Sequence, residues 1–452
     1  MSSTEELKAN DAKWPNPAYA WFVLLLLNLA YILAFVDRLI VGLLIDPIRI
    51  DLNLTDTQIS LIGGAAFALF YSIIALPIGR IIDRTNRVFV LSLGIFLWSL
   101  TTAAAGLAQS FSQLFLARMG VGVGEAAIVP AGYSIISDYF PPQKLALAIG
   151  VFVMSAAMGA GLALIIGGTV IEILSGVDFS SIAFLSELKL WQLTLMAVGL
   201  PGIAVALLVL LIKEPVRRGS LKQAAQREGG ANTISTTLLG FMKQHRGVYV
   251  PLIGGAACAN IYVSCIFLWV PTFLSRIHGW SPEEVGTRFG LVLLTAGAAG
   301  ALSGGFIATA LMARGFKDGT VRVMIGALAI VFPLSIIAPF APAFVSLLLF
   351  GLAFYFLAIA AATAPSALQL VTPNEMRGQV AAIFGLTINL VGLGAGPTSV
   401  ALLTDYLFKD PQALGSSLAV VGGITAPVSV LILIVALRNF SQMMVTSKRW
   451  NS

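Results

Sequence analysis

Residues 18–45 read AYAWFVLLLLNLAYILAFVDRLIVGLLI and carry only two charges, Asp37 and Arg38. The run is longer than the roughly 20 apolar residues that a transmembrane helix needs. Its apolar residues are continuous, whereas the strands of a membrane barrel alternate. It is also too long for the apolar core of a signal peptide, and the 17 residues before it contain acids and no apolar run. We therefore expect a membrane-spanning helix that stays in the mature protein.

Further runs of the same kind fill the rest of the chain of 452 residues, which is 58% hydrophobic and 11% charged. Soluble chains are about 25% charged, so the composition excludes a water-soluble protein. The chain is predicted to be an all-α membrane protein with twelve transmembrane helices. The predicted spans are 18–45, 57–79, 88–108, 112–138, 145–171, 191–212, 248–275, 284–312, 320–338, 343–370, 378–404 and 416–437.

One long hydrophilic connection separates the spans into six plus six. The division predicts five segments: a tail at 1–17, a first six-helix bundle at 18–212, a linker at 213–247, a second six-helix bundle at 248–437 and a tail at 438–452. Apolar residues recur at near-helical spacing in the linker and predict a short helix on the membrane surface. These residues are Ile234, Leu238, Leu239, Phe241 and Met242.

The second half repeats features of the first at an offset near half the chain. Gly79 and Gly305 each end a span before a basic loop, and Pro141 and Pro373 each precede a basic residue and a glycine-bearing span. The repeat predicts two pseudo-symmetric bundles around a central cavity. Small residues also cluster in four spans, which is typical either of ordinary membrane packing or of a sliding seam between the bundles. The glycines are Gly63, Gly64, Gly159, Gly161, Gly167, Gly168, Gly297, Gly300, Gly304, Gly305, Gly392, Gly394 and Gly396.

Most basic residues lie on one side of the predicted membrane. With loops assigned alternately to two sides, 20 of the 27 Lys and Arg residues share the side of both termini and the linker, 5 lie on the other side, and Arg38 and Arg118 lie inside spans. The positive-inside rule makes the crowded side cytoplasmic. The net charge of +6 therefore indicates topology and not a nucleic-acid site. We expect a multi-pass protein of a bacterial inner membrane with both termini cytoplasmic.

Four charged residues lie inside otherwise apolar spans: Asp37 and Arg38 in the first, and Arg118 and Glu125 in the fourth. A charge at the bilayer centre costs at least about 2.5 kcal/mol, so these residues should face the bundle interior and are functional candidates. Asp37 and Arg118 have similar predicted depths, which predicts an ion pair between them and leaves Glu125 more isolated. Desolvation should favour the neutral form of the isolated acid, so Glu125 is the candidate proton carrier. The alternative is an ion-pair network that only fixes the bundle geometry.

The loop after the second span reads GRIIDRTNR, residues 79–87. An acid four residues after a glycine, followed by arginines, suits a conformational lock that pairs across the cytoplasmic seam or faces a helix N-terminus. We assign this role to Gly79, Asp83, Arg84 and Arg87. Topology anchoring is the alternative for the arginines but not for Asp83. The second half carries Thr309 at the equivalent position, so no such lock is expected there.

The second bundle has no clear ionisable residue in mid-span, and its polar candidates for lining the cavity are Asn260, Tyr355 and Asn389. The chain has no Gly-Lys dipeptide, which excludes a P-loop. His245 and His278 lack metal-ligand spacing, and Cys258 and Cys265 are too far apart along one helix for a disulfide. No paired nucleophile and base is visible, so we expect no enzyme, no metal and no cofactor other than the proton as coupling ion.

The motifs resemble those of the major facilitator superfamily. Gly79-x-x-x-Asp83-Arg84-x-x-Arg87 and Arg118-x-x-x-Gly122-x-Gly124-Glu125 are similar to its signature loops, and twelve spans with a central cytoplasmic loop cover the whole chain. Within the superfamily, four segments resemble the spinster-like transporters. They are Val36-Asp37-Arg38, Asp56-Thr57-Gln58, Gly122-Val123-Gly124-Glu125-Ala126 and Pro373-Asn374-Glu375-Met376-Arg377-Gly378.

The resemblance implies alternating access and lipid-like cargo such as lysophospholipids or sphingoid phosphates. It also implies that Asp37 and Glu125 are protonated during transport, while Arg38 and Arg118 pair with them or meet an anionic head group. Organic-anion symporters share an Asp-Arg in the first span and an Arg with a Glu in the fourth. The fifth span resembles the glycine-rich antiporter motif without its proline, which leaves symport and antiport open.

We expect a proton-coupled secondary transporter that moves an amphipathic anionic lipid as a monomer and binds no nucleic acid. Few amide side chains lie in the spans, and a sugar site would need more hydrogen-bonding partners. The alternatives are an organic-anion/proton symporter and a membrane lipid sensor that does not transport.

Overall fold

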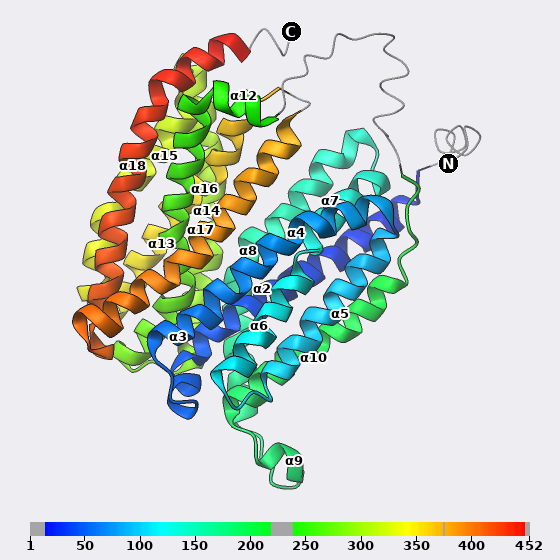
Figure 1. Cartoon of the computed structure of the whole chain (residues 1–452), viewed down its shortest axis with the longest axis vertical. Helices are drawn as coiled ribbons and strands as arrows, with labels where there is room; N and C mark the ends of the chain where they lie inside the picture. Colours follow the sequence, from blue (N-terminus) through cyan, green and yellow to red (C-terminus); the bar gives the residue numbers. More distant parts are fainter. Residues whose placement is uncertain (1–13, 218–237, 374–375, 448–452) are drawn as a thin grey trace.

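The computed structural model describes residues 14–217, 238–373 and 376–447, and the regular structure in these ranges is helical (Figure 1). Twelve helices there are long and apolar enough to cross a membrane. Each overlaps one predicted span, so the predicted fold class is confirmed. The calls on residues 1–13, 218–237 and 374–375, which include Ile234, lie outside the described residues.

The first bundle is built from six spans. They are α2 (Pro17–Asp51); α3 (Asp56–Ser60), η1 (Leu61–Ala65) and α4 (Ala66–Arg84); α5 (Arg87–Ala105); α6 (Phe111–Glu125) and α7 (Ile128–Tyr139); α8 (Pro142–Ser175); and α10 (Leu190–Leu210), which follows the four-residue α9 (Ala183–Ser186). The fourth span is interrupted directly after Glu125. Pro130 has no N–H to donate to the carbonyl of Ala126, which explains the break at this point.

The second bundle has the same number of spans. They are α13 (Arg246–His278); α14 (Pro282–Ala313); α15 (Gly319–Ile337) with η2 (Ala338–Phe340); α16 (Ala343–Leu370); α17 (Arg377–Leu402) with η4 (Leu403–Phe408); and α18 (Leu414–Ser447) after η5 (Pro411–Ala413). The short helix α12 (Leu238–Gln244) precedes it in the predicted linker, where Phe241 is buried. Ser281 and Glu284 form a capping box at the start of α14, and Gly279 ends α13 with a φ of 71°.

The two bundles repeat each other in space. In the first, α2 packs on α8 and α10, α6 packs on α4 and α5, and α5 packs on α10. In the second, the corresponding helices make the same contacts: α13 packs on α17 and α18, α16 packs on α14 and α15, and α15 packs on α18. The predicted pseudo-symmetry is therefore present. Both ends of the described chain lie on one side of the molecule, called here the terminal side, and α3 and α9 lie on the far side (Figure 1).

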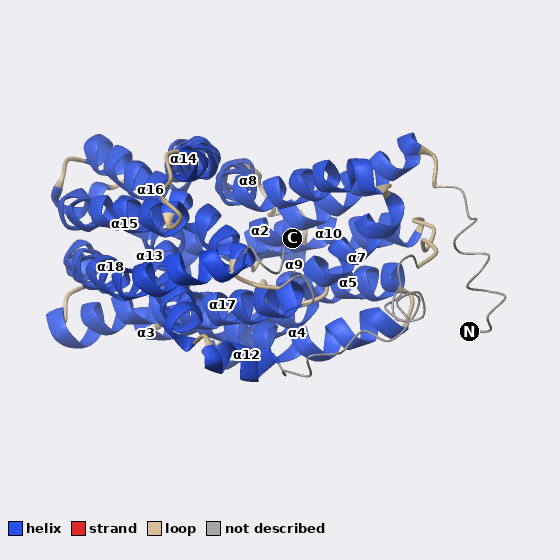
Figure 2. Ribbon diagram, turned by 90° about the horizontal axis from the view of Figure 1, so that it is seen from above, coloured by secondary structure: helices blue, strands red, loops and turns tan. Residues whose placement is uncertain are grey.

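Three helix pairs form the seam between the bundles: α8 with α14, α4 and η1 with α17, and α2 with α13 (Figure 2). Glycines bring backbones together there. A Cβ on Gly161 would lie 2.5 Å from the Gly290 carbonyl oxygen, and one on Gly64 would lie 2.5 Å from that of Leu393. These contacts support the seam interpretation for Gly64 of the second span and Gly161 of the fifth. It is wrong for Gly159 and Gly167 of the fifth span, which pack on α2 of their own bundle. In the eighth and eleventh it is wrong for Gly300, Gly304, Gly392 and Gly396, which pack on α16 or α13 of their own bundle.

Towards the terminal side the same helices separate. A Cβ placed on any of four glycines there would meet no other described atom within 4 Å; these are Gly79, Gly150, Gly305 and Gly385. They lie on α4, α8, α14 and α17, the helices that form the outer pairs of the seam. The glycine contacts across the seam lie in the far-side halves of these helices, and the two bundles diverge towards the terminal side (Figure 1). The described structure is therefore closed between the bundles on the far side and open on the terminal side.

Candidate functional site

The four charged residues singled out in the first bundle lie together between α2 and α6. We call Asp37, Arg38, Arg118 and Glu125 the buried cluster. Arg118 and Glu125 are fully buried, Asp37 is 2% exposed, and the Arg38 side chain is 16% exposed. Charges on apolar helices are costly in lipid, and these four avoid it by facing the interior of the bundle. Of the four residues, Arg38 is the one whose side chain is partly accessible from outside the protein.

Arg38 is the partner of Glu125. Its Nη2 donates to Glu125 Oε2 in an ion pair between α2 and α6. The same guanidinium lies over the ring of Phe67 at 4.4 Å from the centroid and beside Phe35 at 5.2 Å. Cation–π contacts of this kind hold a guanidinium in an apolar wall. The site therefore presents one arginine that is both paired and partly accessible.

The predicted ion pair between Asp37 and Arg118 is wrong. Arg118 Nη1 donates instead to the backbone carbonyl oxygen of Asp37, at 2.9 Å. Among the described residues no carboxylate oxygen lies within 4.0 Å of an Arg118 nitrogen. Depth along the helix, which the prediction used, is similar for Asp37 and Arg38. Their side chains point about 100° apart because a helix has 3.6 residues per turn, and it is Arg38 that points at an acid of α6. The predicted isolation of Glu125 is therefore also wrong, since Arg38 is its partner.

Unpartnered polar atoms concentrate around the buried cluster. In the described part of the chain, 14 buried side-chain nitrogen and oxygen atoms have no hydrogen-bond partner. Nine of them lie on α2, α4, α5 and α6; they are Asp37 Oδ1, Arg38 Nε, Ser72 Oγ, Trp98 Nε1, Ser99 Oγ, Thr102 Oγ1, Arg118 Nε, Arg118 Nη2 and Glu125 Oε1. Most buried polar atoms in proteins are hydrogen-bonded, so such a concentration marks a place that takes up protons, water or a polar ligand group.

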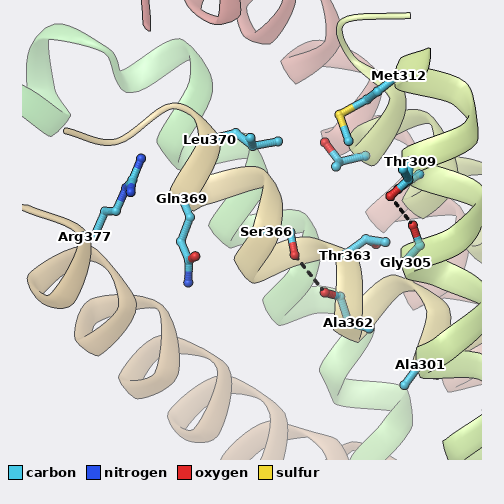
Figure 3. Close-up of a pocket in the computed structure, with 12 residues that line it drawn as sticks. Ala301, Gly305, Thr309, Met312, Ala362, Thr363, Ser366, Gln369, Leu370 and Arg377 are labelled. Atoms are coloured by element: carbon cyan, nitrogen blue, oxygen red, sulfur yellow. Dashed lines mark hydrogen bonds between the residues drawn. The ribbon is translucent and has the colours of Figure 1, made fainter. Parts of the chain in front are cut away.

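The polar candidates of the second bundle do not converge on one site. Asn260 donates to the carbonyl oxygen of Ile388 at 3.1 Å, Asn389 donates to that of Gly385 in its own helix, and Tyr355 donates to Ser303 Oγ at 2.9 Å. A separate pocket of about 400 Å³ opens between α14 and α16 towards the terminal side (Figure 3). Gln369, Ser366 and Arg377 line it, and the three candidates do not.

The loop that follows α4 makes its contacts within the first bundle. Arg87 is buried, pairs with Asp138 of α7, and donates to Glu214 at 2.7 Å. These acids are the partners of Arg87 in the described conformation, which is open on the terminal side, and the contact across the seam stays a prediction for the other conformation. Arg84 is exposed, Gly79 faces open space, and the side chain of Asp83 lies outside the described part of the chain.

A second charged group, which sequence reasoning missed, closes the far side. Arg276 of α13 donates to Asp46 of α2 from Nη2 at 2.6 Å and to Asp56 of α3 from Nη1 at 2.7 Å. Arg49 lies beside both acids, with its Nε at 3.5 and 3.7 Å from their oxygens. We call Asp46, Arg49, Asp56 and Arg276 the far-side cluster. These residues occupy span ends, where single charges are common, so only their spacing in the fold reveals the group.

Hydrogen bonds next to this cluster also join the bundles. The backbone N–H and hydroxyl of Thr57 both donate to Asp405 Oδ2 at 2.6 Å. Thr272 donates to the carbonyl oxygen of Gly42 at 3.3 Å. Asp405 belongs to η4, a π-helical turn, and the seam glycines Gly63 and Gly64 belong to η1, another. Turns of this type are frequent at functional sites. In the described ranges, no group of three His, Cys, Asp or Glu residues is placed to hold a metal ion.

Comparison with known proteins gives a family match, two relatives and a similar solved structure. A model of the Major Facilitator Superfamily matches residues 27–397. An MFS-type efflux pump of Mycolicibacterium smegmatis is 28% identical over 408 residues, which are 89% of each chain. The probable L-galactonate transporter of Escherichia coli is 23% identical over 414 residues, which are 89% of this chain and 86% of that one.

Among solved structures, a bacterial homologue of the human lysosomal transporter Spinster is similar, in an inward-facing and unoccupied conformation. The TM-score is 0.75 at 26% sequence identity, over 96% of this chain and 99% of that one. This relationship confirms the resemblance to spinster-like proteins.

Proposed function

The chain belongs to the major facilitator superfamily of transporters, and from that premise we propose that it is a proton-coupled secondary transporter of an amphipathic, anionic lipid. The cargo is a single-chain lipid with a phosphate-type head group, and the mechanism is alternating access. The observation that carries the proposal is the buried cluster: two acids and two arginines sunk in the first bundle among unpartnered polar atoms.

Charge balance gives the coupling. With both acids ionised, the two negative and two positive groups of the buried cluster cancel. A proton that reaches Glu125 breaks its ion pair with Arg38 and leaves the cluster with one net positive charge. An anionic head group then finds a partner in Arg38, which is the accessible member. Because linkage is reciprocal, bound anion also favours the protonated acid.

In the proposed mechanism the two bundles move relative to each other at the seam. The structure is closed on the far side by the far-side cluster and open on the terminal side. In our proposal the terminal side is cytoplasmic, in accord with the excess of Lys and Arg there, and the protein lies in a bacterial inner membrane. The conformation described is then the inward-facing one, and transport requires the bundles to rock until the far side opens.

The choice of cargo rests on two supports. A structural neighbour over nearly the whole chain is described as a homologue of the lysosomal transporter Spinster. In addition, the site offers charged groups and aromatic rings but few amides, which suits one charged head group on an apolar tail better than a sugar. The protein works as a monomer in the bilayer, with the proton as coupling ion and no other cofactor or nucleic-acid partner.

An organic-anion/proton symporter is the second candidate, because a relative that aligns with 89% of this chain is named a probable L-galactonate transporter. It uses the same buried cluster for a soluble carboxylate. A membrane lipid sensor that does not transport is the third; it uses the cluster only to hold the bundle together.

Flux into liposomes under an imposed pH gradient separates these candidates. The purified full chain is reconstituted and offered a lysophospholipid, a sugar-acid carboxylate, or neither. Gradient-driven lipid flux that is abolished by Glu125→Gln supports the proposal. Carboxylate uptake without lipid flux replaces it with the second candidate, and no flux of either cargo replaces it with the third. Glu284→Gln is the matched control, because Glu284 is a partly exposed acid whose ion pair with Arg288 lies on one helix.

A further inference from the structure

Both carboxylate partners of Arg276 belong to the opposite bundle. Its guanidinium is 5% exposed and reaches from α13 across the seam to Asp46 and Asp56. Its one further described contact is a 3.3 Å hydrogen bond to the carbonyl oxygen of Pro411. Among the described residues of the second bundle, no carboxylate lies within 4.0 Å of it. The second bundle therefore gives this arginine no negative charge of its own.

The two acids of the far-side cluster, in contrast, have a basic residue beside them in their own bundle. Asp46 and Asp56 belong to the first bundle, as does Arg49, whose Nε lies 3.5 and 3.7 Å from them. When the bundles part on the far side, Arg49 stays beside both acids. Arg276 moves away with α13 and loses both. Opening also lets water reach the guanidinium, so the open form presents a hydrated arginine without a carboxylate partner, to which an anion can bind.

We propose that Arg276 is a gated anion site: Asp46 and Asp56 fill it when the far side is closed, and the anionic head group of the cargo fills it when the far side is open. This inference rests on the proposed function for the identity of the cargo. It adds a second head-group site, distinct from the buried cluster, at the far end of the transport path. The ligand class is a phosphate or carboxylate, free or on a lipid.

The geometry suits such an exchange. Arg276 uses all three of its guanidinium nitrogens on the two acids, with Nε at 3.1 Å from Asp46 and Nη2 at 3.0 Å from Asp56 in addition to the two shorter contacts. An arginine fork of this kind matches the oxygens of phosphate and carboxylate equally well. The hydrogen bonds of Thr57 to Asp405 have to break in the same opening, because they also join the two bundles.

The test is the affinity of the full chain in nanodiscs for lysophosphatidic acid, inorganic phosphate and uncharged monoolein, without a pH gradient. Asp46→Asn with Asp56→Asn releases Arg276, and lysophosphatidic acid should then bind about tenfold more tightly, the gain of one charge-assisted contact. Monoolein should not change. Adding Arg276→Gln to the double variant should remove the gain, while adding Arg49→Gln, which deletes the same charge from the first bundle, should keep it.

Opening is checked separately. Spin labels on Ile50 and Gln412, which are exposed on the two sides of the cluster, should move apart in the double variant and in both triple variants. Unchanged distances in the double variant, or an affinity gain that survives Arg276→Gln, would overturn the proposal. A gain with inorganic phosphate as well as the lipid supports it and shows that the head group suffices. Because no flux is measured, failure of proton-driven transport would leave this result standing.

Discussion

Arg38 of α2 is ion-paired with Glu125 of α6, across 87 positions of the chain. The contact joins α2, which packs on α13 across the seam, to α6, in which Glu125 is fully buried. In the proposed mechanism, protonation of Glu125 would do two things at once: it would free an arginine for an anion and remove an attraction between two helices. The proposal therefore places proton binding, cargo binding and helix movement at this pair.

The first prediction concerns pH. Affinity for an anionic amphiphile should rise as pH falls, because each proton taken up by the buried cluster adds a positive charge for the anion. Affinity for an uncharged analogue should stay constant. Calorimetric titration in two buffers of different ionisation enthalpy would measure the proton uptake directly. In Glu125→Gln the uptake should disappear; persistence of the full uptake would remove Glu125 from the coupling.

The second prediction concerns Arg118, which has two nitrogens buried without a described partner. Arg118→Ala should weaken binding of a phosphate-bearing lipid more than binding of its uncharged analogue, by about tenfold or more, the value of one charge-assisted hydrogen bond. Equal losses for both ligands would mean that the arginine only supports the carbonyl of Asp37. Arg118→Lys keeps the charge but not the fork, and should recover part of the difference.

Much of the fold could be predicted from the sequence because span length and apolarity are local properties. The gathering of Asp37, Arg38, Arg118 and Glu125 also followed from the cost of charge in lipid. Their pairing did not, since rotation about two helix axes decides between adjacent residues and depth does not report it. The far-side cluster was not predicted. Arg276 was one of five basic residues assigned to the side opposite the termini, and only the fold brings it to Asp46.

The third prediction separates Arg87 from Arg84. Arg87→Ala removes the ion pairs that Arg87 makes with the buried Asp138 and with Glu214, which should cost about 3–5 kcal/mol of the unfolding free energy. Thermal unfolding in detergent should show a clear fall in Tm. Arg84→Ala, at an exposed position of the same loop, should leave Tm unchanged. Similar falls for both variants would contradict the assignment of Arg87 as a tie within the first bundle.

The fourth prediction concerns Asp83, which follows Gly79 in the predicted conformational lock. If the acid closes the terminal side in the other conformation, Asp83→Asn weakens that closure and shifts the population towards the form described here. Spin labels on opposite bundles at the terminal side should then report longer distances. Unchanged distances would discard the lock, and Asp178→Asn, in an exposed loop on the far side, serves as the control.

The fifth prediction compares two glycines of α8. Gly161 lies in the closed part of the seam, where a Cβ would come within 2.5 Å of the Gly290 carbonyl oxygen and 2.6 Å of the Leu294 backbone nitrogen. Backbone atoms cannot yield as a side chain does, so Gly161→Ala should push α8 and α14 apart and lengthen the distance between labels on Ile50 and Gln412.

Gly150 is the matched control, since a Cβ there meets no described atom within 4 Å. Gly150→Ala should leave that distance unchanged and raise the unfolding free energy by up to about 1 kcal/mol, the gain of alanine over glycine inside a helix. The two variants add the same methyl group to the same helix, so a difference in conformation between them can come only from the seam. If Gly161→Ala behaves like Gly150→Ala, close glycine contact does not hold the far side closed, and the far-side cluster has to do so alone.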